Sequence, residues 1–209
     1  MGENVVKGTI GILTSGGDAP GMNPAIRAVV RAALSKGYNV KGIRHGYNGL
    51  LTDDIFDMDL RSVSEIIHRG GTMLYTARSM EFMTEEGQQK AAETCRRYGI
   101  DTLVVIGGDG SFRGCLAISQ KGIKCIGIPG TIDNDIACSE YTIGYDTALN
   151  TAMEMIDKLR DTTQSHERCC VVEVMGRHSG YLAINTAIAT GALCVLIPEM
   201  GEINIQEDV

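Results

Sequence analysis

The sequence predicts an α/β fold, a parallel sheet with helices on both faces. Apolar runs of strand length alternate with segments of helical period along the chain. The clearest run, residues 102–106, reads Thr-Leu-Val-Val-Ile, as expected for a strand that is buried on both faces of a parallel sheet. With 209 residues, 44% of them hydrophobic, the chain can bury a sizeable core.

The chain is predicted to open with a strand, a loop and a helix. We expect the strand at residues 9–14, a glycine-rich loop at 15–21 and then a helix that Gly37 ends. One face of this helix is apolar and consists of Ala25, Ile26, Val29, Val30, Ala33 and Leu34. A second strand is expected at 40–43, and residues 62–65, Ser-Val-Ser-Glu, form a capping box that predicts a short helix.

The middle of the chain repeats this alternation. Thr84 can cap a helix that Gly99 closes. The strand at 102–106 runs into a second glycine-rich loop, 107–111, and a further helix, and the next strand is expected at 124–128.

The last third of the chain begins with a polar loop at 129–135. A long helix follows at about 147–162, with an apolar face of Leu149, Ala152, Met153, Ile156 and Leu159. A strand is expected at 171–174, a turn at 175–177, another helix, and a last strand at 194–197.

Charge and hydropathy argue against two classes of partner. The formal net charge of −7 disfavours nucleic acid, whose backbone requires a basic surface, although small anions need only a few local arginines. No apolar run approaches the roughly 20 residues of a membrane span. The first residues lack the basic and apolar regions of a secretory signal, so we expect a cytoplasmic protein that does not contact a membrane.

The seven cysteines lack C-x-x-C spacing, and an odd number fits a disulfide framework poorly. We therefore expect reduced thiols in the core and no zinc site. The histidines also lack metal-ligand spacing and are interpreted as structural; they are His45, His68, His166 and His178.

The glycine-rich loops are candidates for phosphate binding. Loops 15–21, 107–111 and 129–135 all follow predicted strands, at the sheet edge where open α/β folds bind ligands. In the second loop, Gly-Gly-Asp-Gly-Ser, the absent Cβ atoms let N–H groups approach phosphates, and the following helix points its positive end there. Asp109 could hold the Mg²⁺ that accompanies nucleotide phosphates, but a tight turn with Asp109 as a helix cap explains the same residues.

Asp133 and Asp135 are two residues apart, so their side chains point the same way in an extended loop. One could accept a hydroxyl proton while the other lies near a metal, which suits phosphoryl transfer. An Asx-rich turn whose carboxylates cap N–H groups is the alternative. Arg78, Arg168 and Arg177 stand near glycine- or serine-rich turns and could bind phosphate or form ordinary surface ion pairs.

Four longer motifs stand out in the sequence: LTSGGDAPGMN at 13–23, IGGDGS at 106–111, PGTIDND at 129–135 and VMGR at 174–177. Together they resemble the bacterial-type ATP-dependent 6-phosphofructokinase family. The resemblance runs from the first strand to Pro198-Glu199. It implies transfer of a phosphoryl group from ATP to D-fructose 6-phosphate in glycolysis, giving fructose 1,6-bisphosphate. It also implies a nucleotide-binding domain at 1–143 and the first part of a sugar-phosphate domain at 144–209.

The resemblance implies roles for individual residues. The implied ATP ligands are Gly17, Tyr47, Arg78, Ser79, Gly108, Asp109, Gly110 and Ser111, with Asp109 on Mg²⁺. The implied sugar-phosphate ligands are Thr131, Ile132, Asp133, Arg168, Met175, Gly176 and Arg177. By the same similarity, Asp133 accepts the proton of the sugar 1-hydroxyl, Thr131 positions the transferred group and Arg78 neutralises its charge. Arg168 reaches across from a neighbouring subunit in the family's homotetramers.

The chain departs from the family's pattern in two places. It is expected to stop before the family's C-terminal portion, which leaves the second domain incomplete and the activity of this chain alone open. The second departure is in the allosteric site for ADP or phosphoenolpyruvate. Its arginines match, as Arg27, Arg31 and Arg160, but Leu60 and Leu193 stand where charged residues are typical.

Two alternative functions remain. The pyrophosphate-dependent sister enzymes typically carry Asp where Gly110 stands and Lys where Gly130 stands, and those side chains fill the space of the ATP α-phosphate. The two glycines therefore favour ATP as the donor. Outside the enzymes, the alternative is a non-catalytic nucleotide-binding fragment.

Overall fold

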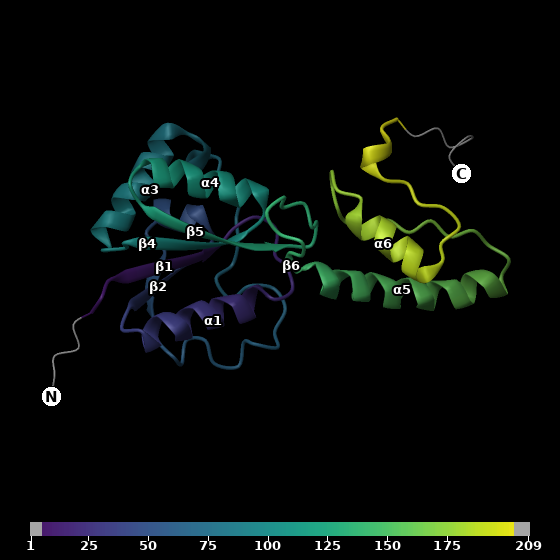
Figure 1. Ribbon diagram of the computed structural model, residues 1–209, viewed down its shortest axis with the longest axis horizontal. Coiled ribbons are helices and arrows are strands. Elements are labelled where there is room, and N and C mark those ends of the chain that lie inside the picture. The colour runs from purple at the N-terminus through teal and green to yellow at the C-terminus, as the bar shows by residue number, and fades with distance from the viewer. Residues whose placement is uncertain (1–5, 203–209) are drawn as a thin grey trace. The chain divides into compact units, whose positions relative to one another are not determined.

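A computed structural model describes residues 6–202, and the chain divides into two compact units (Figure 1). The first unit ends at Gly130, and the second begins at Thr131. The domain boundary expected at residue 143 therefore lies inside the second unit. The assignment of the two domains to nucleotide and sugar phosphate stays a prediction.

The sheet confirms the predicted α/β class. Its strands are β1 (Thr9–Thr14), β2 (Asn39–Ile43), β3 (Ile55–Met58), β4 (Thr102–Gly107), β5 (Lys124–Thr131) and β6 (Ile143–Gly144). Their order is β3-β2-β1-β4-β5-β6. The β1–β2, β1–β4 and β4–β5 pairs are parallel, whereas β3 runs antiparallel to β2.

The helices of the described chain agree with the strongest sequence signals. They are α1 (Met22–Ser35), α2 (Tyr47–Leu51), α3 (Glu85–Arg97), α4 (Asp109–Gln120), α5 (Tyr145–Ser165) and α6 (Tyr181–Thr190), with 3₁₀ turns η1 (Glu81–Met83) and η2 (Pro198–Met200). Gly37 follows α1 with φ of 83°, and Gly99 follows α3 with φ of 66°. Both glycines adopt the left-handed conformation that ends a helix, as predicted.

The core of the first unit lies on both faces of its sheet. Side chains alternate along a strand, so Leu13, Leu103 and Val105 pack in a cluster with residues of α2, α3 and α4. Ile12 and Ile106, which alternate with them, are also fully buried. Figure 1 shows α3 and α4 on one side of the sheet and α1 on the other. The unit is therefore the three-layered arrangement that the sequence predicts.

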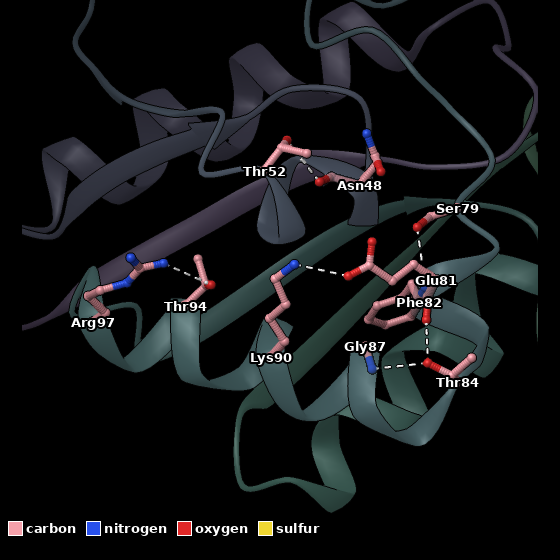
Figure 2. Close-up of polar contacts among 10 residues, drawn as sticks. All are labelled: Asn48, Thr52, Ser79, Glu81, Phe82, Thr84, Gly87, Lys90, Thr94 and Arg97. Carbon is pink, nitrogen blue, oxygen red and sulfur yellow. Dashed lines mark hydrogen bonds and ion pairs between the residues drawn. The ribbon is translucent and has the colours of Figure 1, made fainter.

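The start of α3 shows how local chemistry positions a helix in this unit (Figure 2). The Thr84 hydroxyl accepts a hydrogen bond from the N–H of Gly87 at 3.1 Å, which satisfies one of the free N–H groups of the first turn. Lys90 forms an ion pair with Glu81 at 2.9 Å, and the Ser79 hydroxyl accepts from the N–H of Phe82 at 3.2 Å. The predicted cap is confirmed.

The predicted helix at 62–65 is wrong, because these residues form turns. Asp59, not Glu65, supplies the organising carboxylate: its Oδ1 accepts from the N–H groups of Arg61 and Ser62 and from the Ser62 hydroxyl. Glu65 has φ of 55°, which is incompatible with the interior of a right-handed helix. A competing Asx turn therefore replaces the capping box.

The strands predicted at 171–174 and 194–197 are also wrong. Both segments are irregular, and Val171 is 93% exposed. A strand exists only when a neighbour pairs with its backbone, and apolar β-branched residues alone do not supply one. By contrast, β5 extends through Pro129 to Thr131, so the first residues of the predicted loop at 129–135 belong to the strand.

Burial corrects the interpretation of the cysteines as core thiols. Cys95 and Cys115 are buried, whereas Cys138, Cys169 and Cys170 are exposed.

Between residues 6 and 202, none of the helices combines the length and apolar character that crossing a membrane requires.

Candidate functional site

Two glycine loops lie together because of the strand order. The chain leaves β1 toward β2 on one side, whereas β4 lies on the other side of β1, so β1 and β4 form the topological switch point. Their ends are level, because Thr14 is opposite Ile106. The loops that follow, residues 15–21 and 107–111, therefore share the crevice where open α/β sheets bind ligands. We call them the first and second glycine loops.

A hydrogen bond ties the two glycine loops together. The Ser111 hydroxyl donates to the carbonyl of Ser15 at 2.9 Å, and both residues are buried. The approach requires glycine at 107, because a Cβ there would lie 2.4 Å from the Ser15 oxygen and 2.5 Å from Ser111 Oγ. The glycines of this loop were predicted to let N–H groups approach phosphates, whereas at Gly107 the absent Cβ lets the two loops approach each other.

Tyr47 supports the second glycine loop from the buried side. Its hydroxyl donates to the carbonyl of Ser111 at 2.7 Å, and its ring stacks on Phe82 with centroids 4.0 Å apart. Only 5% of Tyr47 is exposed, and burial raises the pKa of its phenol. The structure therefore places Tyr47 as a buried support of the loop rather than at its open surface.

The open surface of the loops consists of glycines and a carboxylate. Gly17, Asp109 and Gly110 are exposed, and Gly108 is half-buried as the N-cap of α4. The first N–H groups of a helix have no partner within it, so those of α4 are available to an anion. The Asp109 carboxylate does not cap the helix; it forms an ion pair with Arg113 at 2.9 Å. This excludes the alternative in which Asp109 is a helix cap.

Gly110 and Gly130 differ in what surrounds them. A Cβ at Gly110 would meet no atom within 4 Å and would extend into open space. A Cβ at Gly130 would lie 2.9 Å from Ile106 Cγ2 and 3.6 Å from Met22 Cε, inside the packing between sheet and α1. Of these two glycines, Gly110 is therefore the one that borders open space.

Residues 69–76 hold the first glycine loop in place. The Thr76 hydroxyl donates to the carbonyl of Gly16 at 2.5 Å, and the Thr14 hydroxyl donates to the carbonyl of Tyr75 at 2.8 Å. Asn23, at the start of α1, donates to the carbonyls of Arg69 and Gly70 and accepts from the N–H of Met73. These contributions were missed from sequence; the run Arg-Gly-Gly-Thr at 69–72 is the signal that could have revealed them.

Arg78 and Ser79 follow this segment. Arg78 is exposed, and within residues 6–202 its guanidinium has no hydrogen bond or ion pair, which leaves it available to an anion. Ser79 is half-buried and accepts a hydrogen bond from Phe82.

In the second unit, residues 131–135 form a folded turn, which we call the aspartate loop. The N–H of Asp133 donates to the Thr131 hydroxyl at 3.2 Å, and Asn134 has φ of 50°. Asn134 Oδ1 accepts from the N–H of Thr142 at 2.9 Å, and the Thr142 hydroxyl donates to the Thr131 carbonyl at 2.6 Å. Amide and hydroxyl groups thus satisfy the backbone, and neither carboxylate is used as a cap.

The turn at 175–179 contacts the aspartate loop. The Ser179 hydroxyl, which is buried, donates to the carbonyl of Asp133 at 2.6 Å. The Ser179 N–H donates to Gly176 at 2.9 Å, and Arg177 has φ of 54°, an unusual conformation for a residue with a long side chain. The structure therefore brings Asp133 and the Arg177 turn together, as the resemblance implies. Ser179 was missed from sequence.

The pKa of Asp133 lies above that of an ordinary aspartate. Burial is the largest cause, and the charge of Asp135 adds to it, whereas the charge of Arg177 lowers the pKa in part. A carboxyl group with a raised pKa is a stronger proton acceptor than an exposed aspartate once it is ionised. Asp133 is also half-buried, whereas its neighbour Asp135 is exposed.

The remaining predicted residues lie mostly on the surface. Ile132 is half-buried, and Met175, Arg168 and Arg177 are exposed. Of the predicted effector arginines, Arg31 and Arg160 are exposed, whereas Arg27 Nη1 donates to the carbonyl of Val63 at 2.7 Å. Leu60 is 51% exposed and Leu193 is 98% exposed.

Comparison with curated proteins shows that the chain is similar to ATP-dependent 6-phosphofructokinases. The chain is 61% identical to the "ATP-dependent 6-phosphofructokinase" of Clostridium botulinum over 191 residues, which cover 91% of this chain and 60% of that protein. The enzyme of the same name from Clostridium acetobutylicum is also 61% identical, over 193 residues. The chain thus spans about three-fifths of the length of these curated relatives.

Solved structures share the fold. The phosphofructokinase of Saccharomyces cerevisiae matches with a TM-score of 0.85 and 41% identity, covering 92% of this chain and 29% of that one. A "Pyrophosphate-dependent phosphofructokinase" from Marinobacter aquaeolei matches with a TM-score of 0.73 at 24% identity, covering 87% of this chain and 49% of that one, and supports the fold alone. The sequence profile of the family described as Phosphofructokinase matches residues 9–208, and the chain belongs to this family.

Proposed function

We propose that this chain carries the ATP-binding region and part of the sugar-phosphate region of an ATP-dependent 6-phosphofructokinase. The observation that carries the proposal is the environment of Asp133, a half-buried carboxyl with a raised pKa beside the Arg177 turn. Phosphoryl transfer to an alcohol needs a positioned base and cationic groups for phosphate, and this arrangement offers both. The names of the clostridial relatives support ATP and fructose 6-phosphate as substrates.

For ATP, we propose that the glycine loops and the start of α4 bind the phosphates. Gly17, Gly108 and Gly110 leave backbone N–H groups accessible, and the exposed Arg78 can neutralise charge on the transferred group. Ser111 and Tyr47 act by holding the loops together, through their bonds to Ser15 and to each other. Ser79, which follows Arg78 in the chain, is a further proposed ligand of ATP.

The residues present fit a magnesium ion that arrives with the nucleotide. Mg²⁺ is usually held by one or two carboxylates together with phosphate oxygens and water, so a protein cage is not needed. Asp109 is an exposed carboxylate at the open surface of the second glycine loop. The ion would supply charge neutralisation at the phosphates, and Asp109 would exchange its ion pair with Arg113 for a metal bond.

For the sugar phosphate, we propose that Asp133 accepts the proton of the 1-hydroxyl as the new bond forms. Thr131 positions the transferred phosphoryl group through its hydroxyl. Ile132 and the Met175-Gly176-Arg177 turn line the sugar-phosphate site. Arg177 binds the phosphate. Arg168 is exposed and therefore available to a neighbouring subunit, and we propose the cytoplasmic homotetramer that the resemblance implies.

Two observations bear on the alternative functions. Open space at Gly110 favours ATP over pyrophosphate, because Asp in the sister enzymes would occupy it. A non-catalytic nucleotide-binding fragment keeps the glycine loops and lacks turnover, so activity separates it from an enzyme.

The test is calorimetric titration of the purified chain with Mg-ATP and with fructose 6-phosphate, followed by an assay of ADP release. The proposal expects both ligands to bind and pyrophosphate to fail as a donor. Asp133→Asn should keep both affinities, and Asp157→Asn, on the exposed surface of α5, serves as the matched control. Binding of ATP without any turnover would identify the fragment, and turnover with pyrophosphate would overturn the choice of donor.

A further inference from the structure

The segment of residues 72–76 is fixed to the end of β1. Thr14, the last residue of this strand, is fully buried, and its hydroxyl donates to the carbonyl of Tyr75 at 2.8 Å. The Thr14 and Thr72 hydroxyl oxygens are hydrogen-bonded to each other, also at 2.8 Å. Thr76 follows Tyr75 directly, so its backbone is held by the sheet although it belongs to no helix or strand.

The Thr76 side chain connects this segment to the first glycine loop. Its hydroxyl donates to the carbonyl of Gly16 at 2.5 Å, and Thr76 is half-buried. Gly16 has φ of 88°, in the left-handed region that glycine adopts without steric cost. A side chain anchored to the sheet therefore holds a backbone group in the most permissive part of the loop.

The carbonyl of Gly16 and the N–H of Gly17 belong to the same peptide group. None of the peptide bonds between residues 6 and 202 is cis, so these two groups point in opposite directions. Holding the carbonyl toward Thr76 therefore turns the Gly17 N–H away from Thr76. Gly17 is exposed, and within the described residues its N–H has no hydrogen-bond partner. The hydrogen bond from Thr76 thus fixes the direction of an N–H group that is free to bind a ligand.

We propose that Thr76 is a positioning residue for phosphate binding, which sets the orientation of the Gly16–Gly17 peptide and presents the Gly17 N–H to the phosphates of ATP. The identity of the ligand rests on the proposed function, whereas the orientation of the peptide does not. Arg78, whose guanidinium is available to an anion, follows Thr76 by two residues. The same hydrogen bond therefore ties together two kinds of phosphate-binding group, a backbone N–H and a guanidinium.

A peptide between two glycines depends on such an anchor. Because Gly16 and Gly17 have no Cβ atoms, their peptide group rotates at small steric cost. The rotated peptide would present its carbonyl oxygen to the phosphates, and two groups of like charge repel each other. A hydrogen bond to the carbonyl also polarises the peptide and strengthens its N–H as a donor. Orientation and polarisation by Thr76 therefore both favour the binding of an anion.

The experiment compares three variants with the parent chain by calorimetric titration with Mg-ATP and by urea unfolding. Thr76→Val removes the hydroxyl and keeps the branched shape, whereas Thr76→Ser keeps the hydroxyl. Thr52→Val is the matched control, because the Thr52 hydroxyl also donates to a backbone carbonyl, that of Asn48 at 3.1 Å (Figure 2). Thr76→Val should weaken Mg-ATP binding by about 2- to 12-fold, the net contribution of one hydrogen bond. Thr76→Ser and Thr52→Val should bind as the parent does.

Nuclear magnetic resonance separates the orientation of the peptide from the stability of the fold. In the free chain, loss of the donor should shift the carbonyl-carbon signal of Gly16 upfield in Thr76→Val and leave it unchanged in Thr76→Ser. When Mg-ATP is added, the amide proton of Gly17 in the parent should shift downfield, as a new hydrogen bond requires. This response should be smaller in Thr76→Val. A residue that only stabilised the fold would leave the Gly17 response of the folded chain unchanged.

Several results would overturn the role of Thr76. They are equal affinity of Thr76→Val and the parent for Mg-ATP, and equal losses of affinity in Thr76→Val and Thr76→Ser. A Gly17 amide in the parent that does not respond to bound Mg-ATP would also overturn it, and this measurement needs no variant to fold. A parent chain that binds no Mg-ATP would count against the proposed function, while the Gly16 carbonyl signal would still decide whether Thr76 orients the peptide.

Discussion

The Ser111 hydroxyl donates a hydrogen bond to the Ser15 carbonyl at 2.9 Å and joins two loops that are 96 residues apart in sequence. Both residues are buried, and Ser111 in turn accepts the Tyr47 hydroxyl through its own carbonyl. The geometry of the proposed phosphate site therefore depends on contacts beneath the loops as well as on the glycines at their surface.

Ser111→Ala should destabilise the first unit and weaken Mg-ATP binding. The substitution leaves the buried Ser15 carbonyl without its donor, which costs about 1–3 kcal/mol. Urea unfolding and calorimetric titration measure the two effects. Ser119→Ala, at an exposed position of the same helix, is the control. Equal stability of the two variants would mean that water replaces the Ser111 hydroxyl.

Tyr47→Phe should cost about 0.5–1.5 kcal/mol of unfolding free energy, because it removes one hydrogen bond and keeps the ring stacked on Phe82. Tyr75→Phe provides the comparison at an exposed tyrosine. If Tyr47 contacted ATP directly instead, nucleotide affinity would fall while unfolding in urea stayed as in the parent chain.

Gly110→Asp and Gly130→Lys should impair different properties of the chain, the first its affinity for Mg-ATP and the second its stability. At 110 the new side chain enters open space, so stability should hold and Mg-ATP affinity should fall. At 130 it meets Ile106 and Met22, so the unfolding free energy should drop by about 1–3 kcal/mol, as for other overpacked cores. Gly130→Ala isolates the first atom of that clash. Unchanged ATP affinity in Gly110→Asp would refute the steric account of donor choice.

Asp133→Asn should lower kcat for fructose 6-phosphate phosphorylation by roughly 10²–10⁴-fold, the contribution of a general base. The Michaelis constant should change far less, because the proton is lost in the transition state while phosphate contacts also operate in the ground state. Arg177→Ala should show the opposite pattern. A sharp rise in the Michaelis constant of Asp133→Asn with kcat nearly unchanged would make Asp133 a binding residue.

The raised pKa of Asp133 also predicts a pH dependence of stability. The folded chain binds this proton more tightly than the unfolded chain, so unfolding free energy falls as pH rises from the ordinary aspartate pKa through the native value. Asp133→Asn should therefore gain stability over the parent above this window and none below it. Asp135→Asn should lower the native pKa of Asp133, and with it the upper limit of this pH window, whereas Arg177→Ala should raise both. Urea unfolding across a pH series would detect the two shifts.

ADP and phosphoenolpyruvate should have little effect on activity. Leu60 and Leu193 offer no charge to either effector or to its metal, and Arg27 already donates to the carbonyl of Val63. Kinetics with and without each effector test this. Strong activation by ADP that Arg160→Ala abolishes would contradict the prediction.

Much of the first unit was determined by local sequence. The buried run of β4, the Thr84 cap and the terminal glycines Gly37 and Gly99 all act within a few residues of their own positions. Such signals can be read from sequence because the atoms that satisfy them are nearby in the chain. Asp133 and the glycine loops were also identifiable as candidate site residues from their motifs.

Tertiary structure decided what depends on distant partners. The residues at 171–174 have strand-like composition but no strand to pair with among those the structure describes, so they are irregular. The bond from Ser111 to Ser15, the burial of Tyr47 and the raised pKa of Asp133 all arise from groups brought together by folding. Pairing, burial and electrostatic environment are properties of neighbours in space, and the sequence by itself specifies only neighbours along the chain.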